Sequence, residues 1–206
     1  MPEVLLLCTG NAARSVMAGA ALAHRLPSVR VRTRGTLTVD GQPMSWRTRA
    51  AIEHVGVPVP ASHRSRQAAI ADLDAASLVV AMAPEHVEWV RREHPAAATR
   101  TATLRRLCRD LPGARGASLD ERVAALGLAD VELEPWEEIE DPAGGEAEDF
   151  VACAKSIVEL VDALAEALAV PLAESLAEPL ADPLADPLAE SLADPLAEPL
   201  NEAVDG

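Results

Sequence analysis

A cysteine and an arginine stand six positions apart near the start of the chain, within a segment of small and polar residues. Cys8 opens the segment and Arg14 closes it, in the run CTGNAARS. Cleavage of a phosphate monoester needs a cradle for the non-bridging oxygens, a nucleophile in line with the leaving group, and a proton for that group. The segment can supply the first two, because Cys8 can attack phosphorus and Arg14 is a planar, bidentate phosphate ligand.

The residues between the two suit an anion-binding turn. A short turn between a strand and a helix points its backbone N–H groups inward at the positive end of the helix dipole. Gly10 and Asn11 tolerate the positive φ angles that such a turn requires. The dipole and Arg14 favour the thiolate form of Cys8, to which Ser15 can donate a hydrogen bond. We predict a phosphate-binding loop made of Thr9, Gly10, Asn11, Ala12, Ala13 and Arg14.

The spacing alone is weak support, because a cysteine and an arginine also meet this spacing by chance. In the plainer interpretation Cys8 is an inert small residue at the end of a strand. The context favours chemistry. Val4 to Leu7 predict a short buried strand that runs directly into the loop, and a helix from about Ser15 to Leu26 follows.

Further strands and helices alternate along the chain. Strands are predicted at residues 28–33, 76–82 and 99–104, and helices at residues 45–55, 84–94, 119–126 and 146–168. Alternation implies right-handed crossovers, so we predict an α/β fold: a three-layer, doubly wound sandwich with a four-stranded parallel sheet. Ligands of such sheets bind beyond the carboxyl ends of the strands, where the loop after the first strand lies.

The C-terminal segment differs in composition from the rest. From Pro171 the chain consists of eight tetrads, most of them Pro-Leu-Ala followed by Asp or Glu. Each proline costs roughly 3 kcal/mol inside a helix, so we expect the last helix to end near Leu168 and the tetrads to be extended or disordered. We therefore predict a catalytic domain at residues 1–168 and an acidic tail at residues 169–206. A solubilising spacer is favoured over a docking segment for this tail.

Charge and cysteine usage limit the partners and the compartment. The formal net charge is −15, but ten of the 33 acidic residues follow from Glu166 onward, so the rest of the chain is only mildly acidic. It lacks the basic excess of nucleic-acid-binding proteins. No stretch predicts a membrane span or a secretory signal. Three cysteines suggest neither a disulfide framework nor a metal site. We predict a cytoplasmic protein without cofactor, metal, nucleic acid or membrane partner; the oligomeric state stays open.

The loop resembles that of a known family, the low-molecular-weight protein tyrosine phosphatases. Their pattern places a Cys, a Gly-Asn pair and Arg-Ser in this arrangement close to the N-terminus. The resemblance spans roughly residues 3–165. It includes, besides the loop, Met17-Ala18, Gly35-Thr36, the stretch at residues 63–67, the strand at residues 78–82 and Glu140-Asp141-Pro142. The loop and the Asp-Pro motif together make it fairly specific.

The resemblance implies a metal-independent, two-step mechanism through a phosphocysteine. By motif, Cys8 is the nucleophile, Arg14 binds the phosphate and Asp141 is the general acid, which then acts as the base that activates water. Without the family context, Asp141 would equally be a turn residue in an acidic stretch. The implied substrates are a phosphorylated protein or a small aryl phosphate.

Three residues are expected to support this machinery. The resemblance implies that Asn11 and Ser15 shape the loop and stabilise the thiolate, and that His63 belongs to the hydrogen-bond network around them.

The sequence also departs from the family pattern. Ala13 stands where the family often has a second cysteine that can form a reversible disulfide with the nucleophile, so redox protection by that route is excluded. Residues 143–145, Ala-Gly-Gly, replace the aromatics that commonly follow Asp-Pro, so a phosphotyrosine preference is in doubt. Trp46 and Trp136 are the aromatics best placed in sequence to line the cleft instead, although a packing role in the core or along a helix is favoured for each.

Two other functions stay open. Arsenate reductases share the fold and the loop. The thioredoxin-coupled type needs two further cysteines after the third strand, and residues 82–90 contain none; a reductase that uses an external small thiol remains an alternative. A non-catalytic module that binds phosphorylated ligands is the other, although such modules normally lose the cysteine, arginine or aspartate.

Overall fold

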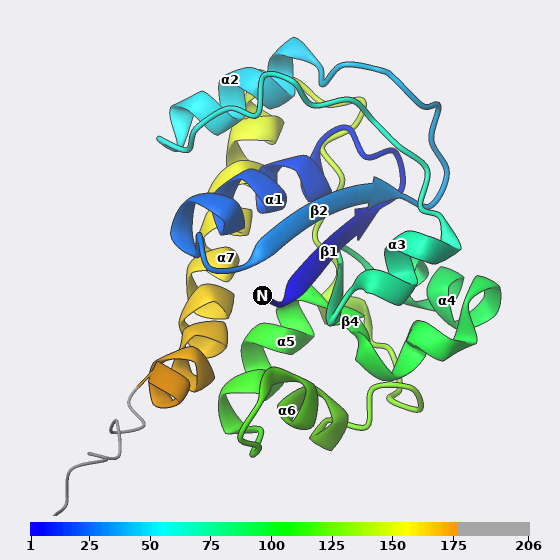
Figure 1. Cartoon of the computed structure of the whole chain (residues 1–206). Coiled ribbons are helices and arrows are strands. Elements are labelled where there is room, and N and C mark those ends of the chain that lie inside the picture. The colour runs from blue at the N-terminus through cyan, green and yellow to red at the C-terminus, as the bar shows by residue number, and fades with distance from the viewer. Residues whose placement is uncertain (177–206) are drawn as a thin grey trace, which may run out of the picture. The chain divides into compact units, whose positions relative to one another are not determined.

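A computed structural model describes residues 1–176 of the chain, and its side chains to residue 169. Within this part, four parallel strands form one sheet in the order β2-β1-β3-β4 (Figure 1). The strands are β1 (Glu3–Cys8), β2 (Arg30–Gly35), β3 (Leu78–Ala81) and β4 (Thr101–Thr103). The helices are α1 (Arg14–Arg25), α2 (Trp46–His54), α3 (Ile70–Ala75), α4 (Pro84–Glu93), α5 (Leu104–Asp110), α6 (Leu119–Ala125) and α7 (Ala147–Leu176). The 3₁₀ turns are η1 (Pro95–Arg100), η2 (Leu111–Gly113) and η3 (Pro135–Glu137).

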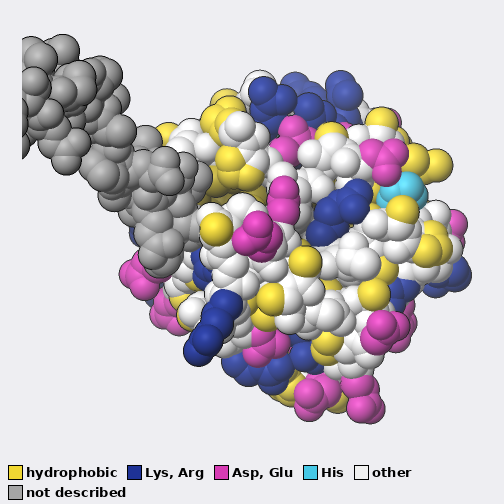
Figure 2. Space-filling view, turned by 60° about the horizontal axis from the view of Figure 1, so that its bottom comes forward, with side chains coloured by type: hydrophobic (Ala, Val, Ile, Leu, Met, Phe, Trp, Pro, Cys, Tyr) yellow, Lys and Arg dark blue, Asp and Glu magenta, His cyan; other side chains and the backbone are white. Residues whose placement is uncertain are grey.

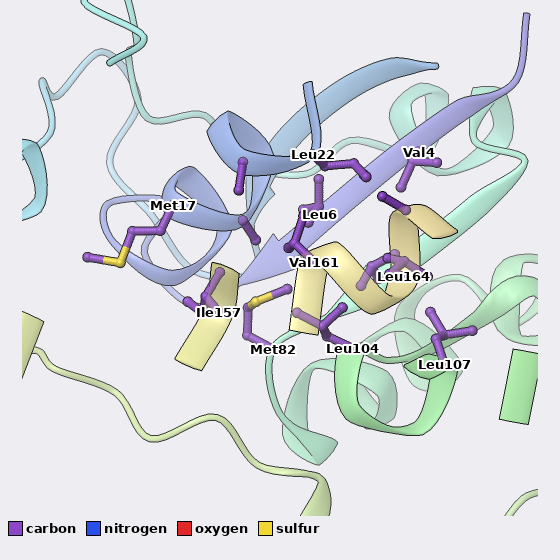
Figure 3. Close-up of a cluster of buried hydrophobic side chains, with 14 of the residues drawn as sticks. Val4, Leu6, Met17, Leu22, Met82, Leu104, Leu107, Ile157, Val161 and Leu164 are labelled. Atoms are coloured by element: carbon purple, nitrogen blue, oxygen red, sulfur yellow. The ribbon is translucent and has the colours of Figure 1, made fainter. Parts of the chain in front are cut away.

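The alternation of side chains along β1 produces the three layers. Val4 and Leu6 point to one face of the sheet and pack with α1, α5 and α7 (Figure 3). Leu5 and Leu7 point to the other face and pack against residues of α3 and α4, such as Leu73. Because all four side chains are fully buried, β1 holds both helical layers together. The predicted α/β sandwich with a four-stranded parallel sheet is thereby confirmed.

Two short helices were not predicted. α3 contains a buried aspartate, Asp72, which accepts hydrogen bonds from the N–H of Ala69 and from Arg34 of β2. α5 follows β4 without a connecting loop, and Thr103, the last residue of β4, caps it by accepting from the N–H of Arg106. Neither helix has an apolar pattern long enough to be recognised in the sequence.

The last helix is longer than predicted. α7 continues to Leu176, through Pro171, rather than ending at Leu168. Proline has no N–H, so the carbonyl of Ala167, four residues earlier, loses its partner within the helix. The buried Arg122 of α6 compensates by donating from Nη1 to this carbonyl at 2.7 Å. The other predicted tail residues, 177–206, lie outside the described part.

The surface of the described part mixes both signs of charge. On the face shown in Figure 2, acidic and basic side chains are interspersed, and hydrophobic ones are scattered among them. No helix within residues 1–176 has the length and apolar character needed to cross a bilayer.

Candidate active site

The loop from Cys8 to Arg14 lies at the carboxyl end of β1, where the doubly wound fold binds ligands. Gly35, at the end of the neighbouring strand β2, makes room for it. A Cβ atom on this glycine would lie 2.5 Å from the carbonyl oxygen of Thr9 and 3.1 Å from the nitrogen of Asn11. The backbones of loop and strand therefore approach more closely than any side chain would allow.

The carbonyl groups of the loop all accept hydrogen bonds from the surrounding protein. The donors are Thr36 N for Cys8, Leu37 N for Thr9, Thr38 Oγ1 for Gly10, His63 Nε2 for Asn11, Thr48 Oγ1 for Ala12 and Met17 N for Ala13, at 2.7–3.0 Å. Within residues 1–176, no protein acceptor is found for the N–H groups of residues 10–13. With its carbonyls bonded outward, the loop leaves a set of donors for an anion.

Asn11 organises the turn. It is fully buried and has a φ of 48°, the only positive φ among the non-glycine residues of the described part. Its side-chain oxygen accepts from the N–H of Arg66 at 3.0 Å, and its Nδ2 donates to Ser15 Oγ at 3.1 Å. These hydrogen bonds offset the conformational cost of the positive φ at Asn11.

The hydrogen bond from Asn11 determines to which group the Ser15 hydroxyl can donate its proton. Ser15 Oγ lies 3.0 Å from Cys8 Sγ, and both residues are buried. Because Ser15 Oγ already accepts from Asn11, its proton is available to the sulfur. A hydrogen bond donated to sulfur stabilises the thiolate, the reactive form of cysteine.

Arg14 and Asp141 form an ion pair, although 127 positions separate them in the chain. Arg14 is almost fully buried. Its Nη1 donates to the carbonyl of Ile139 at 3.0 Å, and its Nη2 donates to Asp141 Oδ2. The Asp141 side chain remains about 40% exposed, and its Oδ1 accepts from the N–H of Ala143 at 3.0 Å. The structure thus brings together Cys8, Arg14 and Asp141.

His63 lies against the outer side of the loop. Its Nε2 donates to the carbonyl of Asn11 at 2.9 Å, so Nε2 carries the proton. Burial lowers the pKa of His63, with help from Arg64 and Arg34, while the bond to Asn11 opposes the shift. The ring is therefore neutral at neutral pH and supports the turn without adding charge.

Comparison with known proteins places the chain in a family. The family model described as low molecular weight phosphotyrosine protein phosphatase matches residues 3–174. The chain belongs to this family. The match covers the phosphate-binding loop, Asp141 and all of the described helices except the last two residues of α7, so the resemblance inferred from the loop and the Asp-Pro motif is confirmed.

Relatives within the family include enzymes named for two different substrates. A protein-arginine-phosphatase from Geobacillus stearothermophilus is 30% identical over 164 residues, which are 79% of this chain and 93% of the relative. A solved structure of an arginine phosphatase from the same organism is 29% identical, with a TM-score of 0.67, over 84% of this chain and 97% of that one. A probable low molecular weight protein-tyrosine-phosphatase from Ralstonia nicotianae is 30% identical over 93 residues, 45% of this chain and 63% of the relative.

Several residues of this phosphatase site were missed by sequence reasoning. His86, which no sequence motif singled out, is buried, and its Nε2 lies 3.0 Å from Thr9 Oγ1 in the loop. Trp89 lines a pocket of about 370 Å³ together with Thr9, Leu37 and His86. An amphipathic helix that starts with Pro84 was predicted, but nothing within it indicated that one of its faces meets the loop.

The two tryptophans singled out from the sequence have different surroundings. Trp46 is 64% exposed at the start of α2, the helix whose Thr48 bonds the loop carbonyl of Ala12. Trp136 lies under the guanidinium groups of Arg106 and Arg109, at 5.6 and 4.5 Å from the ring centre. Trp46 therefore begins a helix that contacts the loop through Thr48, whereas the ring of Trp136 packs against an arginine pair.

The remaining cysteines are poor nucleophiles. Burial raises the pKa of Cys108 and that of Cys153 to about 11, and Cys108 donates to the carbonyl of Leu160. Residues 1–176 contain no group of three His, Cys, Asp or Glu side chains that could hold a metal ion. Cys8 is thus the thiol with the surroundings of a nucleophile.

Proposed function

We propose that this phosphatase hydrolyses phosphotyrosine or another aryl phosphate without a metal ion, through a phosphocysteine on Cys8. The thiolate of Cys8 attacks phosphorus, a sulfur–phosphorus bond forms, and the bond to the leaving oxygen breaks. Asp141 gives its proton to that oxygen. Asp141 then takes a proton from water, which attacks phosphorus, and the sulfur–phosphorus bond breaks to release phosphate.

The observation that carries the proposal is the ion pair between Asp141 and Arg14, the residue that closes the loop containing Cys8. A phosphate group in the loop would compete with Asp141 for the guanidinium of Arg14, because it offers more negative charge and two oxygens for a bidentate pair. The Asp141 carboxyl group, already 40% exposed, would then be free to face the leaving group.

A second substrate class, protein phosphoarginine, is favoured by two observations. The relative that covers most of the chain is named a protein-arginine-phosphatase. Residues 143–145 place no aromatic ring beside Asp141, and a phenyl leaving group gains most from such a ring. An alkylguanidine leaving group needs a proton donor, which the protonated form of Asp141 offers.

We also propose that the protein works in the cytoplasm, without nucleic acid or membrane. The three cysteines are free, which fits a reducing compartment.

Hydrolysis of para-nitrophenyl phosphate in the presence of EDTA tests the chemistry. The wild type should turn over, Cys8→Ser should be inactive, and Asp141→Ala should lose roughly 10²- to 10⁴-fold with a poor leaving group. Turnover by Cys8→Ser would end the nucleophile assignment. An unchanged rate for Asp141→Ala with phenyl phosphate, whose leaving group is poor, would remove its role as general acid.

Substrate choice is tested by comparing a phosphotyrosine peptide with a phosphoarginine peptide of the same sequence. The larger kcat/KM identifies the class. Reduction of arsenate with glutathione, measured in parallel, tests the reductase alternative; arsenate turnover without phosphatase activity would favour it.

A further inference from the structure

Asp141 lies on a long connection with little regular structure of its own. Between the end of α6 at Ala125 and the start of α7 at Ala147, the only helical element in the described structure is the short turn η3. A general acid must be held near its place to within a fraction of an ångström to be effective. Something outside the local backbone must therefore fix this connection.

Glu137, the last residue of η3, is anchored more fully than any other carboxylate near the site. It is fully buried. Its Oε2 accepts from Arg106 Nε at 2.9 Å and from Thr103 Oγ1 at 2.7 Å. Its Oε1 accepts from Arg106 Nη2 and from the N–H of Glu134. Three of the four donors thus tie this carboxylate to the end of β4 and to α5, and the fourth closes the turn η3 itself.

Arg106 is itself buried and also binds the backbone of the connection that carries Asp141. Its side chain is only 6% exposed, and its Nη2 also donates to the carbonyl of Glu132 at 2.7 Å. The ring of Trp136 lies against the guanidinium group. Burial would raise the pKa of Glu137, but the hydrogen bonds from Arg106 and Thr103 outweigh it, so the pKa lies below its ordinary value and the pair is ionised.

Continuous contacts lead from this anchor to the general acid. Arg105 Nε donates to the carbonyl of Glu138 at 3.0 Å, and the N–H of Ile139 donates to the carbonyl of Met82 at 2.9 Å. The carbonyl of Ile139 accepts from Arg14, and Asp141 follows two residues later. The hydrogen bonds made by the residues between Glu137 and Asp141 in the described structure therefore all fix the backbone of this stretch. None of them involves the sulfur of Cys8.

We propose that the buried Arg106–Glu137 pair is a positioning device for Asp141, which places the general acid over the phosphate-binding loop without touching substrate. This inference rests on the proposed role of Asp141. Loss of the pair should displace the proton donor while the loop, which has its own bonds, stays intact.

The test uses the full chain and two aryl phosphates that differ in their need for a proton. Phenyl phosphate has a poor leaving group that must be protonated, whereas dinitrophenyl phosphate has a good one that leaves as an anion. The variant Glu137→Gln keeps the shape of the side chain but removes its charge. We expect its kcat/KM to fall about 10-fold for phenyl phosphate, part of the full effect of a general acid, and to change by less than about 2-fold for dinitrophenyl phosphate.

The control variant Asp72→Asn removes another buried carboxylate that is held by an arginine, Arg34, at the opposite edge of the sheet. It should lower the melting temperature without any dependence on the leaving group. The inhibition constant of inorganic phosphate should stay the same in Glu137→Gln, because the loop does not contact the pair.

The outcomes separate the two proposals. Equal losses on both substrates in Glu137→Gln, or no loss on either, would overturn the positioning role while the effect of Asp141→Ala leaves the mechanism standing. If Asp141→Ala itself shows no dependence on the leaving group, the proposed mechanism fails, and the positioning role is overturned with it.

Discussion

At the scale of single residues, the site depends on the direction of individual hydrogen bonds. Asn11 accepts from the backbone of Arg66 and donates to Ser15, which leaves the proton of Ser15 for Cys8. The substitution Asn11→Asp would replace the Nδ2 donor with an acceptor, so that Ser15 could give its proton to the new carboxylate rather than to the sulfur. A carboxylate there would also bring negative charge close to the thiolate.

His86 gives a prediction about pH. Burial, together with the charge of Arg14, lowers the pKa of His86 to about 3 from 6.5. The unfolded chain takes up a proton near pH 6.5 and the folded one only near pH 3, so stability is complete above pH 6.5 and is lost as the pH falls. We expect the free energy of unfolding to lose about 1.4 kcal/mol per pH unit from this residue.

Urea unfolding of wild type and His86→Asn between pH 6.5 and pH 4.5 measures this effect. The variant should show a shallower dependence on pH, whereas His24→Asn, at an exposed position, should match the wild type. Equal slopes in all three proteins would mean that His86 is not buried as a neutral ring.

Sequence reasoning reached some of these residues and not others, for physical reasons. Cys8, Gly10, Asn11, Arg14 and Ser15 are neighbours in the chain, so their types and spacing show the chemistry directly. The partners of the loop come from distant segments and have ordinary residue types. Thr48, which bonds Ala12, and His86, which bonds Thr9, cannot be distinguished from surface helix residues until the fold brings them to the loop.

At the scale of elements, the long and strongly apolar ones were predictable and the short ones were not. β1 and β3 are continuous apolar runs, and α7 keeps its apolar side over many turns. α3 is held by Arg34, which lies on strand β2. No pattern within residues 70–75 could therefore predict this helix. The end of α7 was predicted wrongly because the cost of Pro171 was counted without Arg122, whose guanidinium takes the place of the missing N–H.

That contact gives a prediction for α6 and α7. Arg122 also donates to the carbonyls of Leu111 and Ala114, so it joins three elements. Arg122→Met should lower the free energy of unfolding by about 3 kcal/mol, because two buried carbonyls and one partly buried carbonyl lose a charged donor. In a Pro171→Ala background the loss should be smaller, because the new N–H can satisfy Ala167.

Chemical denaturation of the four proteins in this cycle gives the coupling energy between the two sites. A coupling of zero would show that Arg122 does not compensate for the proline. Turnover of para-nitrophenyl phosphate should be the same in all four, because α6 does not contact the site.

At the scale of the whole molecule, the family match and the described fold end at almost the same place, at residues 174 and 176. We therefore predict that deletion of residues 177–206 leaves kcat/KM for para-nitrophenyl phosphate within about 2-fold of the full chain. Deletion from residue 169 onward should instead lower the melting temperature, because it removes the last turns of α7. A collapse of activity on removal of residues 177–206 alone would make the tetrads part of the working enzyme.

The outward-bonded carbonyls of the phosphate-binding loop have a consequence for substrate choice. Five of the six carbonyls from Cys8 to Ala13 are held by other segments, and the sixth by the first turn of α1. We therefore expect the loop to bind any tetrahedral oxyanion, whether phosphoryl, arsenate, vanadate or sulfate. A loop of this kind recognises the shape and charge of the anion, but it does not distinguish the group to which the phosphorus is attached. We therefore expect discrimination between an aromatic and a guanidino donor to depend on residues outside the loop, such as Trp89, which shares a pocket with Thr9, and residues 143–145, which follow Asp141.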